Sequence, residues 1–229
     1  MSLNIYTLFL TKPDNKILEN IIIHFPDQIK NKILKYQFLT DKWRACLSEL
    51  LIRKILSEEL NVNSNALKIC SDENLKPYLN NFLRQFNLSH SNNLIVLATD
   101  ETPIGIDIEY VKPLEDLEDI ISYFSQKEQK AFFSKNKKQR LDFFYTLWTL
   151  KESYIKAIGK GLNSPLDSFT IDVSEKNISL ISSVNSNAQW SFKCYQISDN
   201  YKCAVCAQHT QFPESLTIVK ASDLLQLFL

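Results

Sequence analysis

The stretch from Phe143 to Leu162, FFYTLWTLKESYIKAIGKGL, constrains the fold most, because it predicts one long amphipathic helix with a defined end. Apolar residues recur there at spacings of three and four, so they line one face of the helix. Glycine readily adopts a positive φ, so Gly159 and Gly161 predict a C-cap, and Pro165 follows soon after. The residues of this face, which we expect to lie in the core, are Phe143, Leu147, Leu150, Tyr154 and Ile158.

A carboxylate and an ammonium share the opposite face of this helix. Residues are about 100° apart around a helix, so Glu152 and Lys156 lie one turn apart, nearly opposite the apolar face. One interpretation is an exposed ion pair worth about 0.3–0.5 kcal/mol. The other is a functional site, which glycine usage favours. The chain has only 3 Gly: Gly159 and Gly161 follow this helix, and Gly105 precedes an acidic pair, at positions where a backbone turns sharply or approaches a ligand closely.

The acidic pair lies in the segment Ile104–Glu109, which alternates apolar and polar residues and therefore predicts a strand. Asp107 and Glu109 then project from one face, about 7 Å apart along the chain, while Ile106 and Ile108 pack inward. Two neighbouring carboxylates repel each other unless a cation lies between them, and Mg²⁺ suits such oxygen ligands. The alternative is an exposed strand edge on which the two acidic side chains are simply solvated.

A second polar segment, Ser89-His90-Ser91, precedes the strongly apolar run Leu94–Ala98. One interpretation is turn chemistry, since Ser side chains commonly bond to nearby backbone groups. The other is a small polar cradle for a phosphate or for ribose hydroxyls. The two interpretations are left open by these residues alone.

The order of the remaining elements predicts an α+β fold, since strands and helices come first, then helices, then strands. Ser125, with Glu128 three residues later, predicts a capping box. Residues 135–140 are expected to form a polar, basic turn. Helices are expected around Ile21–Ile23, after Pro26, and from Asp41 to the break at Asn61–Asn65. Further strands are expected at Ile5–Leu10, Ala66–Cys70, Ser168–Val173, Ile178–Ser182, Gln189–Ile197, Tyr201–Ala207 and Leu216–Val219.

Composition narrows the class of protein. The 229 residues can bury a large core, as one domain or two small halves. Lys and Arg together number 26, as do Asp and Glu together. This balance argues against a protein that coats nucleic acid, so any phosphate binding has to be local. No stretch approaches the roughly 18 apolar residues of a membrane span, and the N-terminal run lacks the basic region and cleavage site of a signal peptide.

The five cysteines are odd in number and scattered, which is typical of the reducing cytoplasm. Cys203 and Cys206 form a C-x-x-C pattern, which could indicate a metal or redox site. Their segment reads as a strand, however, and an odd separation sends the two side chains to opposite faces. We therefore expect packed free thiols.

Three separated stretches, FNLSHS, IGIDIE and W-x-x-K-E-S-x-x-K-x-x-G-K-G-L, together resemble the phosphopantetheinyl transferases of the surfactin-synthetase-activating type. The tail YKCAVCAQHTQFPESLTIV also resembles the end of those proteins, so the resemblance covers nearly the full chain. It implies two similar α+β halves related by pseudo-twofold symmetry. We place the halves at residues 1–103 and 104–229, although no internal repeat is legible in the sequence.

The resemblance also implies an activity. The phosphopantetheine arm of coenzyme A would move to a serine hydroxyl of an acyl or peptidyl carrier protein, releasing adenosine 3',5'-bisphosphate. Asp107, Glu109 and Glu152 would hold Mg²⁺ on the pyrophosphate, and Glu152 would also take the serine proton, directly or through water. Lys156 would meet the phosphates. Ser89 and His90 would hold the adenosine-side phosphate. Lys76, with Lys32 and Arg44, would complete the cofactor cleft.

The chain departs from the family pattern at two glycines. Leu75 stands where the family often has Gly before the Lys-Pro pair, and Asn92 where it often has Gly after Ser-His-Ser. A close backbone approach is therefore not expected at these positions. The segment after Glu109 is acidic, so an acidic helix of a carrier protein would be repelled if it docked there. Basic residues that contact the carrier protein would have to come from elsewhere in the chain.

We therefore expect a cytoplasmic, monomeric, Mg²⁺-dependent transferase with coenzyme A in the cleft between its halves, and no nucleic-acid or membrane partner. One alternative is a non-catalytic module of the same fold that binds carrier proteins. The presence of Asp107, Glu109, Glu152 and Lys156 counts against it. Another is a metal-dependent phosphohydrolase, which would need additional His or Asp ligands for a two-metal site.

Overall fold

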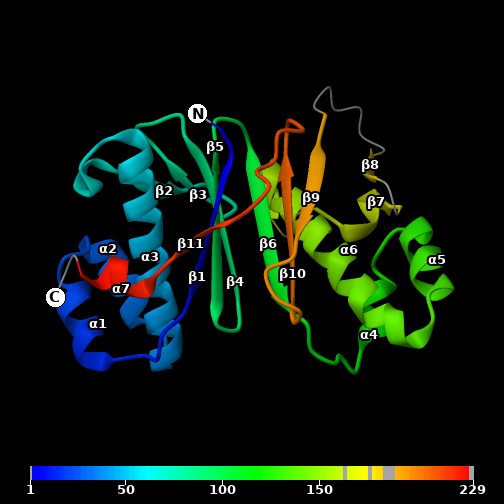
Figure 1. The fold of residues 1–229 in the computed structure, drawn as a ribbon, viewed down its shortest axis with the longest axis horizontal. Helices are drawn as coiled ribbons and strands as arrows, with labels where there is room; N and C mark the ends of the chain where they lie inside the picture. The colour runs from blue at the N-terminus through cyan, green and yellow to red at the C-terminus, as the bar shows by residue number, and fades with distance from the viewer. Residues whose placement is uncertain (1, 162–163, 175–176, 183–188, 227–229) are drawn as a thin grey trace.

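The computed structural model describes residues 2–161, 164–174, 177–182 and 189–226. Leu162, the last residue of the predicted helical stretch, lies outside the described residues. Two sheets stand side by side in the middle of the molecule, with helices on the outer side of each (Figure 1). The α+β fold expected from the sequence is confirmed.

The first half runs from β1 to β5. Its elements are β1 (Asn4–Phe9), α1 (Asn15–Ile22), α2 (Asp27–Leu34), α3 (Leu39–Leu60), the 3-10 helix η1 (Ser64–Ala66), β2 (Ile69–Ser71), β3 (Pro77–Leu79), β4 (Gln85–Ser91) and β5 (Leu94–Asp100). The second half begins at β6. Its elements are β6 (Ile104–Tyr110), α4 (Leu117–Ile121), α5 (Gln126–Ser134), α6 (Lys137–Ile158), the 3-10 helix η3 (Leu166–Ser168), β7 (Phe169–Val173), β8 (Ile178–Ser182), β9 (Ser191–Tyr195) and β10 (Tyr201–Ala207).

Within the described ranges, the two halves repeat one order of α-helices and strands: a strand, three α-helices and, after a 3-10 turn, four strands. They also repeat one antiparallel topology, since the first sheet contains the order β1-β5-β4 and the second has β6-β10-β9. The third helix of each half, α3 or α6, has 22 residues. The expected pseudo-twofold relation is therefore present in the topology, although the amino-acid sequence carries no legible repeat.

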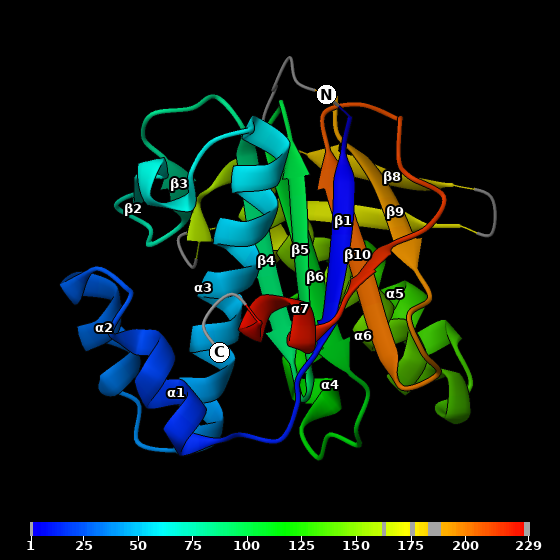
Figure 2. The same cartoon turned by 60° about the vertical axis from the view of Figure 1, so that its left-hand side comes forward.

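The end of the described chain returns to the first half. Strand β11 (Thr217–Val219) pairs in parallel with β1, and helix α7 (Ala221–Leu225) packs near α3. Figure 2 shows this segment crossing from β10 to the outer edge of β1. The first sheet therefore has the order β11-β1-β5-β4 and is completed by residues that follow the second half in sequence.

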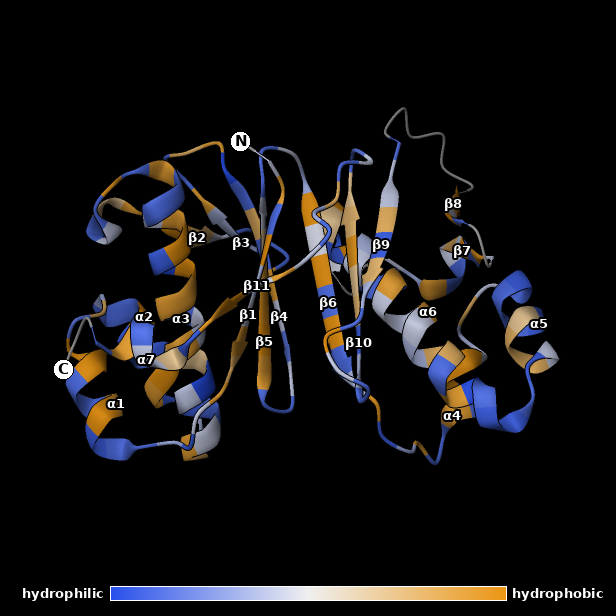
Figure 3. Cartoon of the chain, viewed as in Figure 1, coloured by the Kyte–Doolittle hydropathy of each residue, from blue (hydrophilic) through white to orange (hydrophobic). Residues whose placement is uncertain are grey.

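The molecule has four layers: helices, the first sheet, the second sheet and helices. The core lies between these layers, and the two sheets face each other in the middle. The hydropathy colouring in Figure 3 shows apolar residues along β5 and β6, where the sheets meet. Alternation along β5 sends Ile95 and Leu97 toward α3, and Leu94, Val96 and Ala98 toward the second sheet. The second sheet alternates in the same way, with Val205 facing the first sheet and the following Cys206 facing α6.

Several boundaries differ from the sequence-based expectations. Residues 135–140 were expected as a turn, but α6 begins at Lys137, with the Asn136 side chain accepting a hydrogen bond from the Gln139 amide. Its first turn is charged and largely exposed, so it shows no apolar periodicity that could reveal it. FNLSHS forms strand β4, so the turn interpretation of Ser89 to Ser91 is wrong. Helices α4 and α7 were not expected.

Two other local expectations are confirmed, and the one for Gly105 is corrected. Gly159 ends α6 in the left-handed conformation with φ 69°, and Ser125 and Glu128 form the capping box of α5. Gly105 is required by a close approach of β6 to α6, not to a ligand. A Cβ there would overlap the Ser153 carbonyl oxygen and lie 2.5 Å from the Ala157 amide nitrogen. This approach brings the polar face of β6 against the C-terminal part of α6.

Candidate active site

Side chains of β4, rather than a main-chain ladder, join β4 to β6 and so join the two halves. Three alternate residues of β4 each accept a hydrogen bond from a backbone N–H of β6. The three bonds run from Ile106 N to Asn87 Oδ1 at 2.8 Å, from Ile108 N to Ser89 Oγ at 3.4 Å, and from Tyr110 N to Ser91 Oγ at 3.0 Å. We call this set the β4–β6 rungs.

Two of the β4–β6 rungs also bind the acidic pair. Ser89 Oγ donates to Asp107 Oδ1 at 2.9 Å, and Ser91 Oγ donates to Glu109 Oε2 at 2.8 Å. Each hydroxyl has a single proton, so this donation fixes its direction. The expected strand with Asp107 and Glu109 on one face is therefore present, and both carboxylates are held from the neighbouring strand.

Lys156, from α6, completes the contacts of Asp107. Its Nζ lies 2.6 Å from Asp107 Oδ1, 3.0 Å from Ser89 Oγ and 3.3 Å from the Ile106 carbonyl oxygen. Asp107 is only 4% exposed, so the exposed-edge interpretation is wrong. Within the part of the chain that the structure describes, the ion pair of Lys156 is with Asp107 and not with Glu152, so the surface-pair interpretation is wrong as well.

The three carboxylates influence one another. Burial raises the pKa of Glu152, and the negative charges of Asp107 and Glu109 raise it further, against the opposing effect of Lys156. Burial likewise raises the pKa of Glu109, the Ser91 hydrogen bond lowers it, and the charge of Asp107 raises it again. The site therefore carries more negative charge than Lys156 alone offsets, which is the condition that favours binding of a further cation.

The donor set suits a hard cation. Asp107 Oδ2 is buried and has no hydrogen-bond partner among the described residues, so one carboxylate oxygen is left for a ligand. No group of three or more His, Cys, Asp or Glu side chains that could hold an ion by itself occurs in the described ranges. Mg²⁺ is usually held by one or two carboxylates together with substrate phosphates and water, so such a group is not needed. The residues present fit Mg²⁺ bound jointly with a phosphate-containing molecule.

Three basic residues that are expected to bind coenzyme A lie in the first half. His90 is exposed, yet partial shielding from water lowers its pKa, and the nearby charge of Arg44 lowers it further. Arg44, on α3, forms an ion pair with Asp41. Lys32, on α2, is exposed, and its charge acts on Glu49. The structure thus brings Arg44 close to His90. Lys32 is instead close enough to Glu49 for its charge to act there.

Lys76 lies between the two halves. Its Nζ donates to the carbonyl oxygens of Lys156 at 2.6 Å and Ala157 at 3.2 Å, and lies 3.5 Å from that of Ile104. Burial lowers the pKa of Lys76, and Asp72 opposes this. The ammonium satisfies carbonyls at the end of α6, so in this structure Lys76 acts as a cation at a helix C-terminus.

The two positions that depart from the family pattern keep a glycine-like backbone. Leu75 has φ 63° and Asn92 has φ 51°, both in the left-handed region. Asn tolerates this region better than Leu does. Replacement of glycine therefore leaves the left-handed turn in place at both positions, and at Leu75 it introduces strain.

Sequence reasoning missed two features of the site. Asn87 and Ser91 were not assigned roles, although their alternation with Ser89 beside a second alternating strand was a usable signal. Lys151, next to Glu152, was also missed. It is completely buried and pairs with Glu128, the glutamate of the α5 capping box. The sequence offers little signal for that pair, because the partners are distant along the chain.

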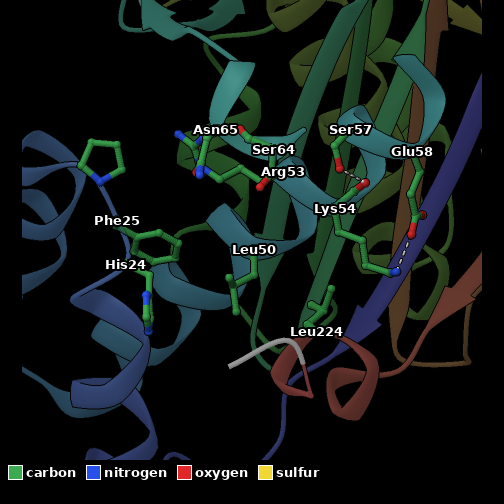
Figure 4. A pocket seen from close by; sticks show the side chains of 11 residues that line it. His24, Phe25, Leu50, Arg53, Lys54, Ser57, Glu58, Ser64, Asn65 and Leu224 are labelled. Carbon is green, nitrogen blue, oxygen red and sulfur yellow. Dashed lines mark hydrogen bonds and ion pairs between the residues drawn. The ribbon is translucent and has the colours of Figure 1, made fainter. Parts of the chain in front are cut away.

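A pocket of about 490 Å³ lies between the α1–α2 turn, α3, η1 and α7 (Figure 4). Phe25, Leu50 and Leu224 supply apolar lining, and Arg53 and Lys54 supply positive charge. Its lining includes none of the carboxylates or rung residues described above. The pocket is therefore separate from the candidate active site.

Comparison with known proteins matches both halves of the chain. A model described as 4'-phosphopantetheinyl transferase superfamily matches residues 103–206, and one described as 4'-phosphopantetheinyl transferase, N-terminal, matches residues 12–102. The chain is 33% identical over 225 residues to 4'-phosphopantetheinyl transferase Sfp of Bacillus subtilis (strain 168), covering 97% of this chain and 100% of that protein. It is 31% identical over 226 residues to 4'-phosphopantetheinyl transferase gsp of Aneurinibacillus migulanus, covering 97% of this chain and 94% of that protein.

Among solved structures, a holo-(acyl-carrier-protein) synthase from Bacillus anthracis in complex with CoA (3',5'-ADP) covers 46% of this chain and 93% of its own. The TM-score is 0.40 and the sequence identity 19%.

Proposed function

The chain belongs to the 4'-phosphopantetheinyl transferase superfamily, and we propose that the residues around Asp107 carry its chemistry. The protein transfers the 4'-phosphopantetheine moiety of coenzyme A to a serine hydroxyl of an apo carrier protein, which leaves adenosine 3',5'-bisphosphate. The observation that supports the assignment is the meeting of Asp107 and Lys156 beside the strand that joins the two halves. A pyrophosphate requires both cations and hydrogen-bond donors, and these residues supply one cation and a site for another.

Asp107, Glu109 and Glu152 would hold Mg²⁺. The unpartnered Oδ2 of Asp107 and the raised pKa values of Glu109 and Glu152 support this role, because a bound cation offsets their mutual repulsion. When bound, Mg²⁺ would offset the charge of the pyrophosphate and of the leaving phosphate. Transfer would therefore depend on Mg²⁺.

Glu152 would act as the general base. It would accept the proton of the carrier serine, directly or through water, as the serine oxygen bonds to the phosphorus next to the pantetheine. The bond from that phosphorus to the bridging oxygen breaks, and the electron pair leaves with adenosine 3',5'-bisphosphate. The raised pKa of Glu152 supports this role, because a base works best when its pKa is near the working pH.

Lys156 would bind the phosphates of coenzyme A, and His90 together with Ser89 would hold the adenosine-side phosphate. Arg44 and Lys32 would line the cofactor cleft. Ser89 belongs to the same proposed cleft, although its only proton is donated to Asp107. Lys76 would also line the cleft. Its side chain reaches the end of α6, where backbone carbonyls hold its ammonium. Coenzyme A would then lie between the halves.

The wider assignments are proposals of the same kind. The matches of the two family models meet at residues 102 and 103, and the repeated order of elements starts again at β6. These observations support a division into residues 1–103 and 104–229, of which β11 and α7 pack back on the first half. No helix in the described ranges is long and apolar enough to cross a membrane. All five cysteines lie among the described residues and are free thiols, which supports a cytoplasmic location. We propose a monomer, since one chain supplies both halves.

One experiment tests the function. The protein is incubated with coenzyme A, an apo carrier protein and Mg²⁺, and the carrier is weighed by mass spectrometry. We expect a phosphopantetheine adduct on the carrier that disappears when EDTA replaces Mg²⁺. A carrier that binds without changing mass would instead indicate a binding module. Consumption of coenzyme A without a carrier would indicate a hydrolase.

A further inference from the structure

We propose that Ser91 is a positioning residue that fixes the Glu109 carboxylate in the active site. The inference rests on the proposed function, in which Glu109 is a metal ligand. Ser91 Oγ accepts from the Tyr110 amide at 3.0 Å and donates to Glu109 Oε2 at 2.8 Å. Both partners are consecutive residues of β6, so one hydroxyl ties the backbone of β6 to a side chain of the same strand.

The position of this hydroxyl is determined by the sheet. Ser91 is the last residue of β4 and is paired with Leu94 of β5, so its backbone is held in the antiparallel ladder. The N–H of Tyr110 occupies an acceptor position of the oxygen, and the single hydroxyl proton is left for Glu109. Glu109 is thus held by a donor whose location and direction are both fixed.

Without this bond, another cation would compete for Glu109. The side chain is half-buried, and the charges of both Lys112 and Lys156 act on it. Lys112 is exposed on the segment that follows β6, whereas Lys156 lies in the last turn of α6. A long Glu side chain without the Ser91 bond is free to turn toward Lys112. The hydroxyl of Ser91 keeps one carboxylate oxygen on the β4 side.

The other β4–β6 rungs provide comparisons. Asn87 accepts from the Ile106 amide and, within the described ranges, makes no hydrogen bond to a carboxylate, so Asn87→Ala removes a rung alone. Ser89 contacts Asp107 and Lys156 as well, so a change there would alter several parts of the site together. Ser91 is therefore the rung at which positioning of a carboxylate can be tested separately.

The test measures metal binding without turnover. Mn²⁺ is titrated into wild type, Ser91→Ala, Ser91→Thr and Asn87→Ala with coenzyme A present and no carrier, and free Mn²⁺ is read by electron paramagnetic resonance. We expect Ser91→Ala to weaken Mn²⁺ binding by about 10-fold or more, the usual effect of removing a partner that orients a metal ligand. Ser91→Thr keeps the hydroxyl and should bind more tightly than Ser91→Ala. Asn87→Ala should lower the melting temperature but not the affinity.

Two results would overturn the inference: unchanged affinity in Ser91→Ala, or equal losses in Ser91→Ala and Asn87→Ala, which would mean that Ser91 acts only by joining the strands. Failure of the proposed function would be seen in the wild-type protein and not in the variants. Wild-type protein that binds no Mn²⁺ in the presence of coenzyme A would remove the metal site, and this inference with it. Thermal melts of all four proteins establish that each is folded.

Discussion

The ammonium of Lys151 lies 2.7 Å from Oε1 and 3.0 Å from Oε2 of Glu128, in an ion pair that is almost completely excluded from water. Lys151 also donates to the Phe169 carbonyl oxygen, and Glu128 accepts from the amides of Ser125 and Ile171. One buried pair thus ties α5, α6 and β7 together. Lys151 directly precedes Glu152, so the pair lies next to the candidate active site.

Lys151→Met should therefore destabilise the protein by about 3–5 kcal/mol, since it leaves the Glu128 carboxylate buried without its counter-charge. The double variant Lys151→Met with Glu128→Gln should recover much of the loss, because neither charge remains. Urea unfolding measured by circular dichroism gives the free energies. A single variant as stable as wild type would show that the pair contributes little to folding.

Asp107→Asn should abolish transfer and also lower the stability of the metal-free protein by about 1–3 kcal/mol, because a buried charge partner of Lys156 is removed. Asp172→Asn is the control. Asp172 pairs with Lys127 at the same 2.6 Å, but both side chains are exposed, so its loss should cost about 0–1 kcal/mol. Carrier mass spectrometry and urea unfolding provide the two measurements. Normal turnover of Asp107→Asn in Mg²⁺ would contradict the metal assignment.

His90→Ala should mainly raise the KM for coenzyme A and leave kcat much less affected, because His90 is placed at the adenosine-side phosphate. Dephospho-coenzyme A lacks that phosphate, so its KM should change much less. Steady-state kinetics with both substrates separates binding from chemistry. Equal losses with the two substrates would place His90 away from this phosphate.

Glu152→Gln should lower kcat by about 10²–10⁴-fold, the usual contribution of a positioned base. Burial and the neighbouring carboxylates raise the pKa of Glu152, and a base must be deprotonated to act. Wild-type activity should therefore fall as the pH drops through this raised pKa, above the ordinary value of about 4.3. The exposed Glu19→Gln on α1 is the control and should keep the wild-type profile. If Glu152→Gln retains wild-type kcat, another group takes the proton.

Leu75→Gly should stabilise the protein slightly, by up to about 1 kcal/mol. Leu75 has φ 63°, which costs a residue with a Cβ about 1–2 kcal/mol, while glycine loses about 0.5–1 kcal/mol of chain entropy on folding. The side chain is 81% exposed, so little packing is lost. Asn92→Gly should change stability less, because Asn already tolerates this conformation. A lower melting temperature for Leu75→Gly would show that the leucine makes a compensating contact.

The parts of the fold that were predicted correctly are those with local, periodic signals. The apolar spacing around Leu147 and Leu150 indicated α6, and the alternation from Ile104 to Glu109 indicated β6. The site was predicted as a set of residues, but their contacts were not. The partner of Lys156 turned out to be Asp107, because β6 and α6 approach closely at Gly105. Such an approach depends on tertiary packing, which spacing along a single helix does not reveal.

Long-range contacts between polar residues were the least predictable. Nothing local in the sequence distinguishes Lys151, which is buried, from Lys160, which is exposed, since the difference lies in Glu128 and the ring of Phe169. The β4–β6 rungs are similar. Asn87, Ser89 and Ser91 resemble turn residues by composition. Their alternation was compatible with a strand, but the β6 backbone as their hydrogen-bond partner becomes visible only in the fold.

The return of β11 to β1 has a consequence for the order in which the protein can be assembled on the ribosome. Strands β1, β4 and β5 emerge long before Thr217–Val219, so the outer edge of β1 stays unpaired while the whole second half is being made. An open strand edge invites pairing with other chains. The nascent first half therefore depends on synthesis running through to α7, whose Leu224 is fully buried in the core around α3. A premature stop before Thr217 would leave the half that was synthesised first without β11 and α7, and so destabilise it.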